Sequence, residues 1–310
     1  MRSVTVCGLL AVFGLWTESA TAQAVRVPGT NVSIAPPPGF AIAQQYPGFE
    51  RPDVQASIMV TELPGAAAKM MKAMTGPALA TRGMVLLTSR NVVINGRPAR
   101  LLHVRQKAGA ADVMKWMLIA GDATMTLMIV GTFAPDASEV GDAIQQSLLT
   151  TSWTGAEKVD AFEGLPFRVT GTQRLKLARR VSNMLMFTES GTIGSPGSTE
   201  AVYFIGHSIG YGAVGELPAF AEKRARETKH VTAIQNFAGR AIHVDGLPGY
   251  ELEADAIDAR AGMPMRLYQV IVPDATGYFI AQGLIRADRA SEVVPEFRAI
   301  TASFRRSGSR

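Results

Sequence analysis

The sequence has one cysteine among its 310 residues and only four histidines. A single cysteine, Cys7, cannot form a disulfide within the chain or a metal site built from several thiolates, so the fold depends on packing alone. The histidines are His103, His207, His230 and His243, and none lies two or four residues from another, as paired zinc ligands do. A glycine loop that could cradle a phosphate is also missing. We therefore predict neither a metal site nor a bound cofactor.

The sequence also lacks a region in which charge of one sign is concentrated. Lys and Arg number 31 and Asp and Glu 26, which gives a net charge of +5. Nucleic-acid binding normally needs a clustered basic face, so we predict no nucleic-acid partner. The two local basic clusters are Arg174, Lys176, Arg179 and Arg180 in mid-chain, and Arg305, Arg306 and Arg310 at its end. We interpret the first as a solvated strand face and the second as a frayed tail, with docking of an anionic lipid or an acidic partner as the alternative.

The N-terminus has the three parts of a cleavable secretory signal peptide. Arg2 supplies the positive charge, residues 4–16 form the apolar stretch, and Ala20-Thr21-Ala22 has the small residues that signal peptidase recognises. The apolar stretch is shorter than the roughly 20 residues with which a helix crosses a bilayer. We predict that residues 1–22 are removed, and that the mature chain begins at Gln23 without an integral membrane span. It is then periplasmic or secreted.

The body of the chain contains an internal repeat. Residues 92–102 read as an apolar run, a polar residue, Gly-x-Pro and a second apolar run, and residues 242–252 give the same order 150 residues later. Gly96 and Gly246 hold the same place in the two copies. Equivalent turns of this kind predict equivalent β-hairpins, because a glycine followed by a proline two residues on specifies a local geometry.

The correspondence continues toward the end of each copy. Residues 116–132 and 268–284 both read as hairpins, and a helix follows each, with Ser138 and Ser291 expected as N-caps. The helices are expected to run to Trp153 and Phe304, which should bury against the sheet of their own copy.

Upstream of the turns, each copy has one strand and one helix. Residues 55–63 and 200–205 are the expected strands, and residues 66–74 and 218–228 the expected helices. The polar segment 154–161 separates the copies. We predict an α+β fold with two tandem repeats, 23–155 and 160–306, each an antiparallel sheet packed with helices.

This pattern resembles the PsbP-like fold, which occurs in PsbP-type lumenal proteins and in small bacterial envelope proteins of the DcrB and LpqN types. The residues that carry the resemblance are 32–40 (VSIAPPPGF), 96–99 and 152–153 in the first copy, and 164–167, 246–248 and 303–304 in the second. The second copy lacks the Pro-Pro-Gly-Phe opening. The resemblance implies tandem PsbP-like domains with an accessory, binding or assembly role, and it supplies no shared catalytic residues.

One motif suggests catalysis. Gly206-His207-Ser208-Ile209-Gly210 matches the G-x-S-x-G nucleophile elbow of α/β-hydrolases. That elbow needs a helix directly after the serine, whereas a glycine-rich stretch follows here. No aspartate lies between Ser208 and His243, the last histidine, so a glutamate would have to complete the triad. A serine hydrolase that uses Ser208 and His243 is therefore the alternative function.

Two further patterns have ordinary structural interpretations. Met71 and Met74 could bind Cu(I) from one helix face, but adaptable core filling is the preferred interpretation. Glu251, Glu253 and Asp255 share one strand face, where we expect solvation and not a cation site. The sequence as a whole predicts an exported, non-catalytic binding or assembly accessory protein of the bacterial cell envelope. Its partner would be an unknown envelope protein or a small ligand.

Overall fold

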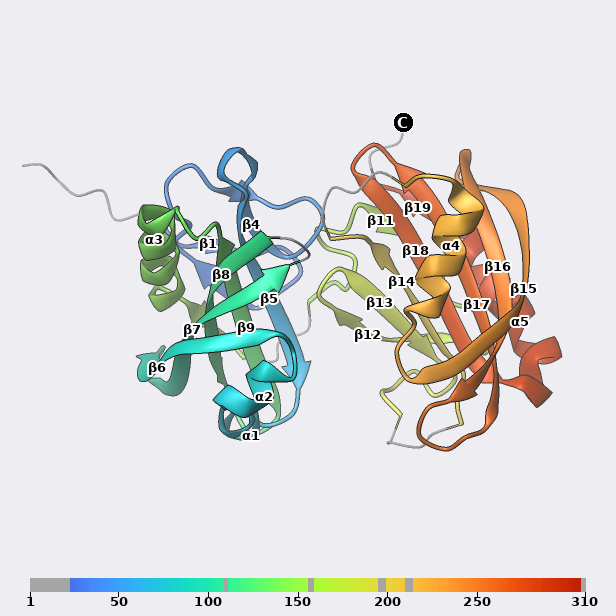
Figure 1. Ribbon diagram of the computed structural model, residues 1–310, viewed down its shortest axis with the longest axis horizontal. Helices are drawn as coiled ribbons and strands as arrows, with labels where there is room; N and C mark the ends of the chain where they lie inside the picture. Colours follow the sequence, from blue (N-terminus) through green and yellow to red (C-terminus); the bar gives the residue numbers. More distant parts are fainter. Residues whose placement is uncertain (1–22, 109–110, 156–158, 195–198, 210–213, 308–310) are drawn as a thin grey trace, which may run out of the picture.

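The structure is a computed structural model that describes residues 23–108, 111–155, 159–194, 199–209 and 214–307. It contains two seven-stranded antiparallel sheets with helices packed on them (Figure 1), which confirms the predicted α+β class. The predicted signal peptide, residues 1–22, lies outside the described residues. Within the described ranges, no helix has the length and apolar character needed to cross a membrane.

The two sheets have the same strand order. The first sheet is β3-β4-β5-β9-β8-β7-β6 and the second is β12-β13-β14-β18-β17-β16-β15. The strands of the first are β3 (Ala41–Ile42), β4 (Gly48–Arg51), β5 (Ala56–Pro64), β6 (Met84–Ile94), β7 (Arg97–Ala108), β8 (Ala111–Gly121) and β9 (Met125–Phe133). Those of the second are β12 (Lys176–Val181), β13 (Met184–Thr188), β14 (Val202–His207), β15 (Val231–Val244), β16 (Leu247–Asp258), β17 (Pro264–Asp274) and β18 (Gly277–Arg286).

Matching turns join the long hairpins. Asn95 and Gly96 have φ of 51° and 73°, and Asp245 and Gly246 have φ of 49° and 77°. Two successive residues in the left-handed region are what a type I′ turn requires, and Asn-Gly or Asp-Gly adopts it at little cost. The turns therefore set the register of β6 with β7 and of β15 with β16 in the same way.

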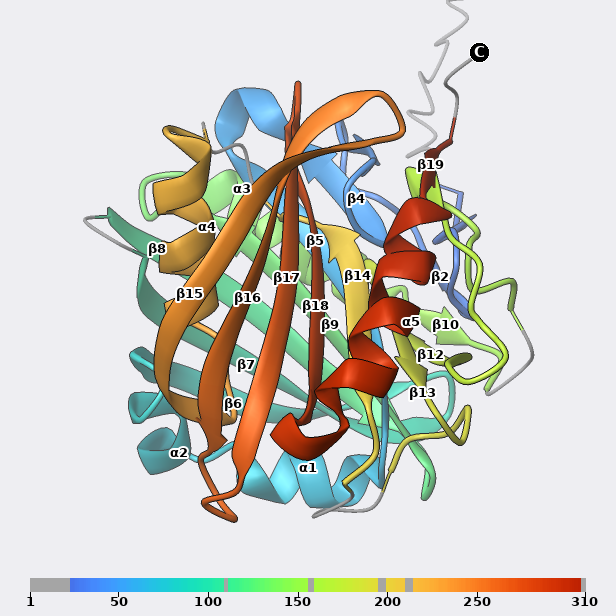
Figure 2. The same ribbon diagram turned by 90° about the vertical axis from the view of Figure 1, so that its right-hand side faces the viewer.

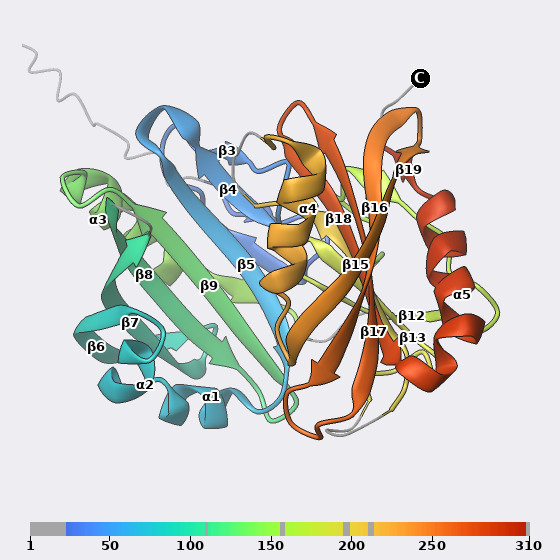
Figure 3. The ribbon, with the colours of Figure 1, turned by 45° about the vertical axis from the view of Figure 1, so that its right-hand side comes forward.

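Helices lie on both faces of each sheet. They are α1 (Ala67–Ala73), α2 (Gly76–Ala80), α3 (Ser138–Leu149), α4 (Leu217–Arg226) and α5 (Ala290–Ala302), with short 3-10 turns η1 (Pro52–Val54) and η2 (Ala287–Arg289). Figure 2 shows α5 in front of the second sheet, and Figure 3 shows α3 and α5 at opposite ends of the molecule. Each of four apolar clusters draws its side chains from one half only. That 23–155 and 160–306 are independent domains stays a prediction.

Short strands from the two ends of each half pair with one another. They are β1 (Val25–Arg26), β2 (Val32–Ile34) and β10 (Ser152–Trp153) in the first half, and β11 (Phe167–Arg168) and β19 (Arg305–Arg306) in the second. β10 pairs with β2, and β19 pairs with β11. The expected frayed tail is therefore wrong for Arg305 and Arg306, while Arg310 lies outside the described residues.

Two details of the helices differ from expectation. The N-cap positions are Ala137 and Arg289, and neither helix has a side-chain cap, so Ser138 and Ser291 lie inside the first turns. A tight turn or 3-10 turn already leads the chain into each helix, which reduces the need for a capping side chain. The helices also end before Trp153 and Phe304. Both aromatics are nevertheless buried, at 4% and 1% exposure, in the cluster of their own half.

Candidate functional site

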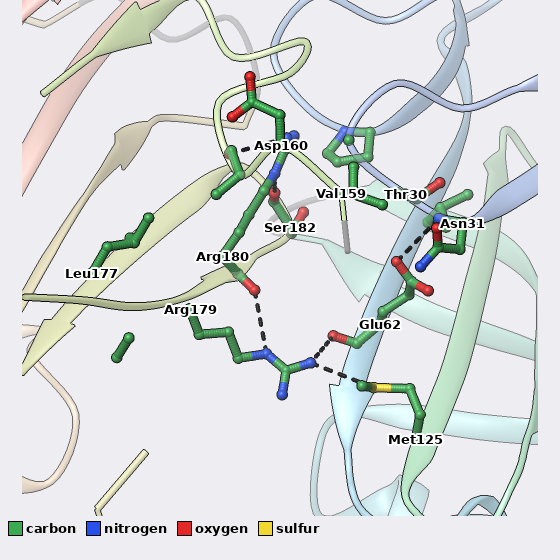
Figure 4. A pocket seen from close by; sticks show the side chains of 15 residues that line it. Thr30, Asn31, Glu62, Met125, Val159, Asp160, Leu177, Arg179, Arg180 and Ser182 are labelled. Atoms are coloured by element: carbon green, nitrogen blue, oxygen red, sulfur yellow. Dashed lines mark hydrogen bonds between the residues drawn. The ribbon is translucent and has the colours of Figure 1, made fainter. Parts of the chain in front are cut away.

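A hollow of about 360 Å³ lies where the two halves meet. Figure 4 shows its lining, with Glu62 and Met125 from the first half and Arg179, Arg180 and Ser182 from the second. It exists because the edge strand β12 packs against β5. The hollow therefore lies at the junction between the two sheets. Its polar groups can either join the two halves or bind a ligand.

Arg179 crosses the junction. Its Nη2 donates to the Glu62 carbonyl at 2.9 Å and lies 3.5 Å from Met125 Sδ, while its Nε donates to the Arg180 carbonyl at 3.3 Å. Burial lowers the pKa of this guanidinium. The interpretation of the mid-chain basic cluster as a solvated strand face is therefore wrong here, because β5 covers this part of the edge strand.

Arg180 holds the loop before β11. Its Nη1 donates to the carbonyls of Ala161 and Glu163, and its Nε donates to the Ser182 carbonyl at 2.6 Å. Burial lowers its pKa to about 10. Gly29 approaches the same guanidinium with φ of 75°, and a Cβ there would overlap Arg180 Nη1. A larger residue at this point would have to displace the Arg180 guanidinium and the Glu163 carbonyl, and it would be strained by the positive φ.

Three further contacts join the halves. Arg26 pairs with Glu163, whose carboxylate also accepts a hydrogen bond from Gly29 N at 3.2 Å. At another point Gln45 Nε2 donates to the Thr276 carbonyl at 3.0 Å. These contacts across the junction give it a structural role. Arg180 Nη2 and Ser182 Oγ, which line the hollow, are buried without a hydrogen-bond partner among the described residues.

Glu163 makes the junction dependent on pH. The hydrogen bond from Arg26 is the main cause that holds the pKa of this carboxyl below its ordinary 4.5. A lowered folded-state pKa contributes stability above the unfolded pKa, and this is lost as pH falls through the folded value. We expect the free energy of unfolding to fall more steeply below pH 4.5 in the wild type than in Glu163→Gln. Denaturant titrations at several pH values measure this, and equal slopes would contradict it.

A second hollow is an open groove of about 1040 Å³ beside α4, on the face of β13, β14 and β18 that lies on the α4 side of the sheet. Figure 3 shows α4 on this side of the second sheet. The apolar side chains that line it are Met184, Val202, Phe204, Ile209, Phe220, Tyr278, Ile280 and Leu284. Basic side chains stand at the end of α4 and just beyond it: Lys223, Arg224, Lys229 and His230.

Polar groups inside the groove are already hydrogen-bonded to the chain. Gln282 Nε2 donates to Thr228 Oγ1 at 3.0 Å and to Gln269 Oε1 at 2.8 Å. Ser208 Oγ accepts a hydrogen bond from Tyr278 N at 3.1 Å. The ring of His207 lies between the Ser208 carbonyl, 2.8 Å from Nδ1, and Asp274 Oδ2, 3.1 Å from Nε2. The groove thus offers apolar surface with few uncommitted polar groups.

The structure does not bring Ser208 and His243 together. Ser208 follows β14, whereas His243 is exposed on the edge strand β15, four strands away in the sheet. At about 4.8 Å per strand this separation is about 19 Å, far beyond hydrogen-bond reach. His207, the histidine next to Ser208 in sequence, directs its ring nitrogens to Asp274 and to the Ser208 carbonyl and not to the Ser208 hydroxyl.

The remaining candidates have structural partners. Glu251 and Glu253 pair with Arg298, and Asp255 pairs with Arg266 at 3.2 Å, so the strand face is an ion-pair network and not simply solvated. Met74 is 4% exposed in the apolar cluster beneath α1 and α2, and Met71 packs against it. No group of three or more His, Cys, Asp or Glu side chains suited to a metal ion occurs in the described part of the chain.

Two of the four histidines have particular environments. His103 stacks on Trp116 with ring centroids 4.1 Å apart, and burial lowers its pKa. His230, with φ of 68°, lies at the rim of the groove. Sequence reasoning missed the groove residues, although the continuous apolar run 201–205 (AVYFI) is the signal that both faces of β14 need a cover.

Comparisons with known proteins place the chain in no family. No family model matches it, and no curated protein matches it. The solution structure of PsbP from Synechocystis sp. PCC 6803 is 16% identical, with 47% of this chain and 99% of that chain covered and a TM-score of 0.31. The apo structure of the immunity protein TplEi of T6SS from Pseudomonas aeruginosa is 10% identical, with 90% and 96% covered and a TM-score of 0.35.

These similarities are too low to argue a function. Similar structures include a PsbP protein, the family named by the sequence resemblance, but the tandem pair of PsbP-like domains stays a prediction. The groove beside α4 is therefore the feature of this chain that points to a function.

Proposed function

We propose that this chain is an exported, non-catalytic binding protein of the bacterial cell envelope that holds a small apolar ligand in the groove beside α4. The observation that carries the proposal is the groove itself, about 1040 Å³ and lined by apolar side chains of β14, β18 and α4. Pockets of roughly 300–1000 Å³ with apolar walls and a few polar groups are typical of small-molecule sites. Export is supported by the pattern of residues 1–22.

The separation of Ser208 from His243 supports binding over hydrolysis by this pair. Ser208 accepts a hydrogen bond from the backbone and lies about four strands from His243. A general base must come within hydrogen-bond reach of the proton that it takes. The described part of the groove therefore offers walls for a ligand, and the predicted pair Ser208 and His243 is not assembled in it.

Native mass spectrometry tests the proposal on the chain purified without detergent from the soluble envelope fraction. We expect the mass of a chain that begins at Gln23 together with a non-covalent small-molecule adduct. Val202→Trp should fill the groove and remove the adduct, because Val202 lines it.

The matched control is Val93→Trp, since Val93 is 71% exposed on β6 in the other half. It should retain the adduct. An adduct that survives in Val202→Trp, or no adduct at all, would contradict the assigned site. Labelling of Ser208 by a fluorophosphonate would instead identify a hydrolase.

A further inference from the structure

We infer that the ligand of the groove is a long-chain fatty acid, with its alkyl chain along the apolar floor and its carboxylate at the basic rim. This rests on the proposed function and names the chemical class of its ligand. Three features of the groove support this ligand: the helices leave it uncovered, its apolar lining is recessed, and basic side chains stand at its rim.

The groove exists because the two sheets are covered unequally. In the first half, α1 packs on β8 and β9 and α2 packs on β6. In the second half the single helix α4 packs on β15, β16 and β17. An apolar strip over β13, β14 and β18, including Met184, Val202 and Phe204, is consequently left beside α4.

The strip is recessed, which favours an alkyl chain over a protein partner. Ile209 is the one apolar lining residue with more than a third of its surface exposed, at 52%, and the others are half-buried or buried. A stable protein interface buries about 800 Å² on each partner and needs an accessible face. A flexible chain of methylene groups can lie along such a recessed strip without an accessible partner face, and each methylene that it buries adds to the affinity.

The charge at the mouth selects an anion. Lys223, Arg224 and Lys229 carry positive charge there, against the single carboxylate of Glu227. Arg224 pairs with Glu227, whereas Lys223 and Lys229 are exposed and form no ion pair within the described ranges. Arg224 Nε is also buried without a hydrogen-bond partner among the described residues. Lys223 complements the negative end of the α4 dipole, but Lys229 lies beyond the helix, where the dipole does not account for it.

Isothermal titration of the delipidated exported chain tests the inference with palmitate and with hexadecanol, which has the same chain length without the charge. We expect one palmitate per chain, bound at least about fivefold more tightly than hexadecanol, because two partly screened lysine contacts contribute about 1 kcal/mol or more together. The double variant Lys223→Gln/Lys229→Gln should remove this preference and leave hexadecanol binding unchanged.

The control is Lys69→Gln, an exposed lysine on α1 in the other half, which should keep the preference. Equal affinity for both ligands in the wild type would overturn the inference, as would a preference that persists in the double variant. If neither ligand binds while the native adduct is present and Val202→Trp removes it, the ligand class is wrong and the proposed function stands. Binding of an acidic amphipathic peptide in place of palmitate would likewise overturn the inference.

Discussion

Phe304→Ala is expected to lower the free energy of unfolding by about 3–5 kcal/mol, as truncation of a well-packed buried aromatic does. Phe304 is 1% exposed. Its ring stacks on Phe167 with centroids 5.7 Å apart and meets Phe279 edge-on at 4.8 Å. Removing the ring leaves a cavity between Phe167 of β11 and Phe279 of β18. Chemical denaturation followed by circular dichroism measures the loss.

Trp153 is the matching residue of the first half and should behave similarly. It is 4% exposed, and its Nε1 donates to Glu62 Oε1 at 2.8 Å. Trp153→Ala also leaves this partly buried carboxylate without that donor, which adds to the cost. Val93→Ala, at a position 71% exposed, is the control and should change stability by less than about 0.5 kcal/mol. A loss below about 1 kcal/mol at Phe304 would contradict its role in closing the core.

The hairpin turns could be predicted from the sequence because they depend on local geometry. Asn95-Gly96 and Asp245-Gly246 need the left-handed conformation, and a glycine at the second position provides it whatever surrounds the turn. The burial of Trp153 and Phe304 followed from the apolar spacing of the helices before them. The ends of those helices were less predictable, since the pairing of β10 with β2 competes with one more helical turn.

The junction and the groove could not be predicted, because both depend on which strand lies at which edge. Arg179 and Arg180 have the composition of a solvated strand face, yet β12 becomes the edge that packs on β5. The groove depends on α4 packing toward β15 and away from β13. Neither arrangement produces a recognisable residue spacing in the sequence, because both depend on packing between segments that are far apart in the chain.

Sequence reasoning also passed over one pair of glycines that explains how close the terminal helices lie to the sheets. Gly131 on β9 faces Ile144 of α3, and Gly283 on β18 faces Phe297 of α5. A Cβ at either glycine would overlap the helix side chain well inside van der Waals contact. Both have ordinary strand conformations, so the requirement for glycine is one of space.

Gly283→Val is therefore expected to destabilise the protein by about 1–3 kcal/mol or more, because the inserted methyl groups push Phe297 off the sheet. The reason can be tested by a double-mutant cycle. In a Phe297→Ala background the valine has room, so the cost of Gly283→Val should shrink by at least about 1 kcal/mol, a coupling typical of side chains in contact. Gly131→Val with Ile144→Ala should give the same sign of coupling in the first half. Additive effects in both cycles would show that the glycines are not required for helix packing. A coupling in one half alone would mean that the terminal helices of the two halves pack on their sheets in different ways.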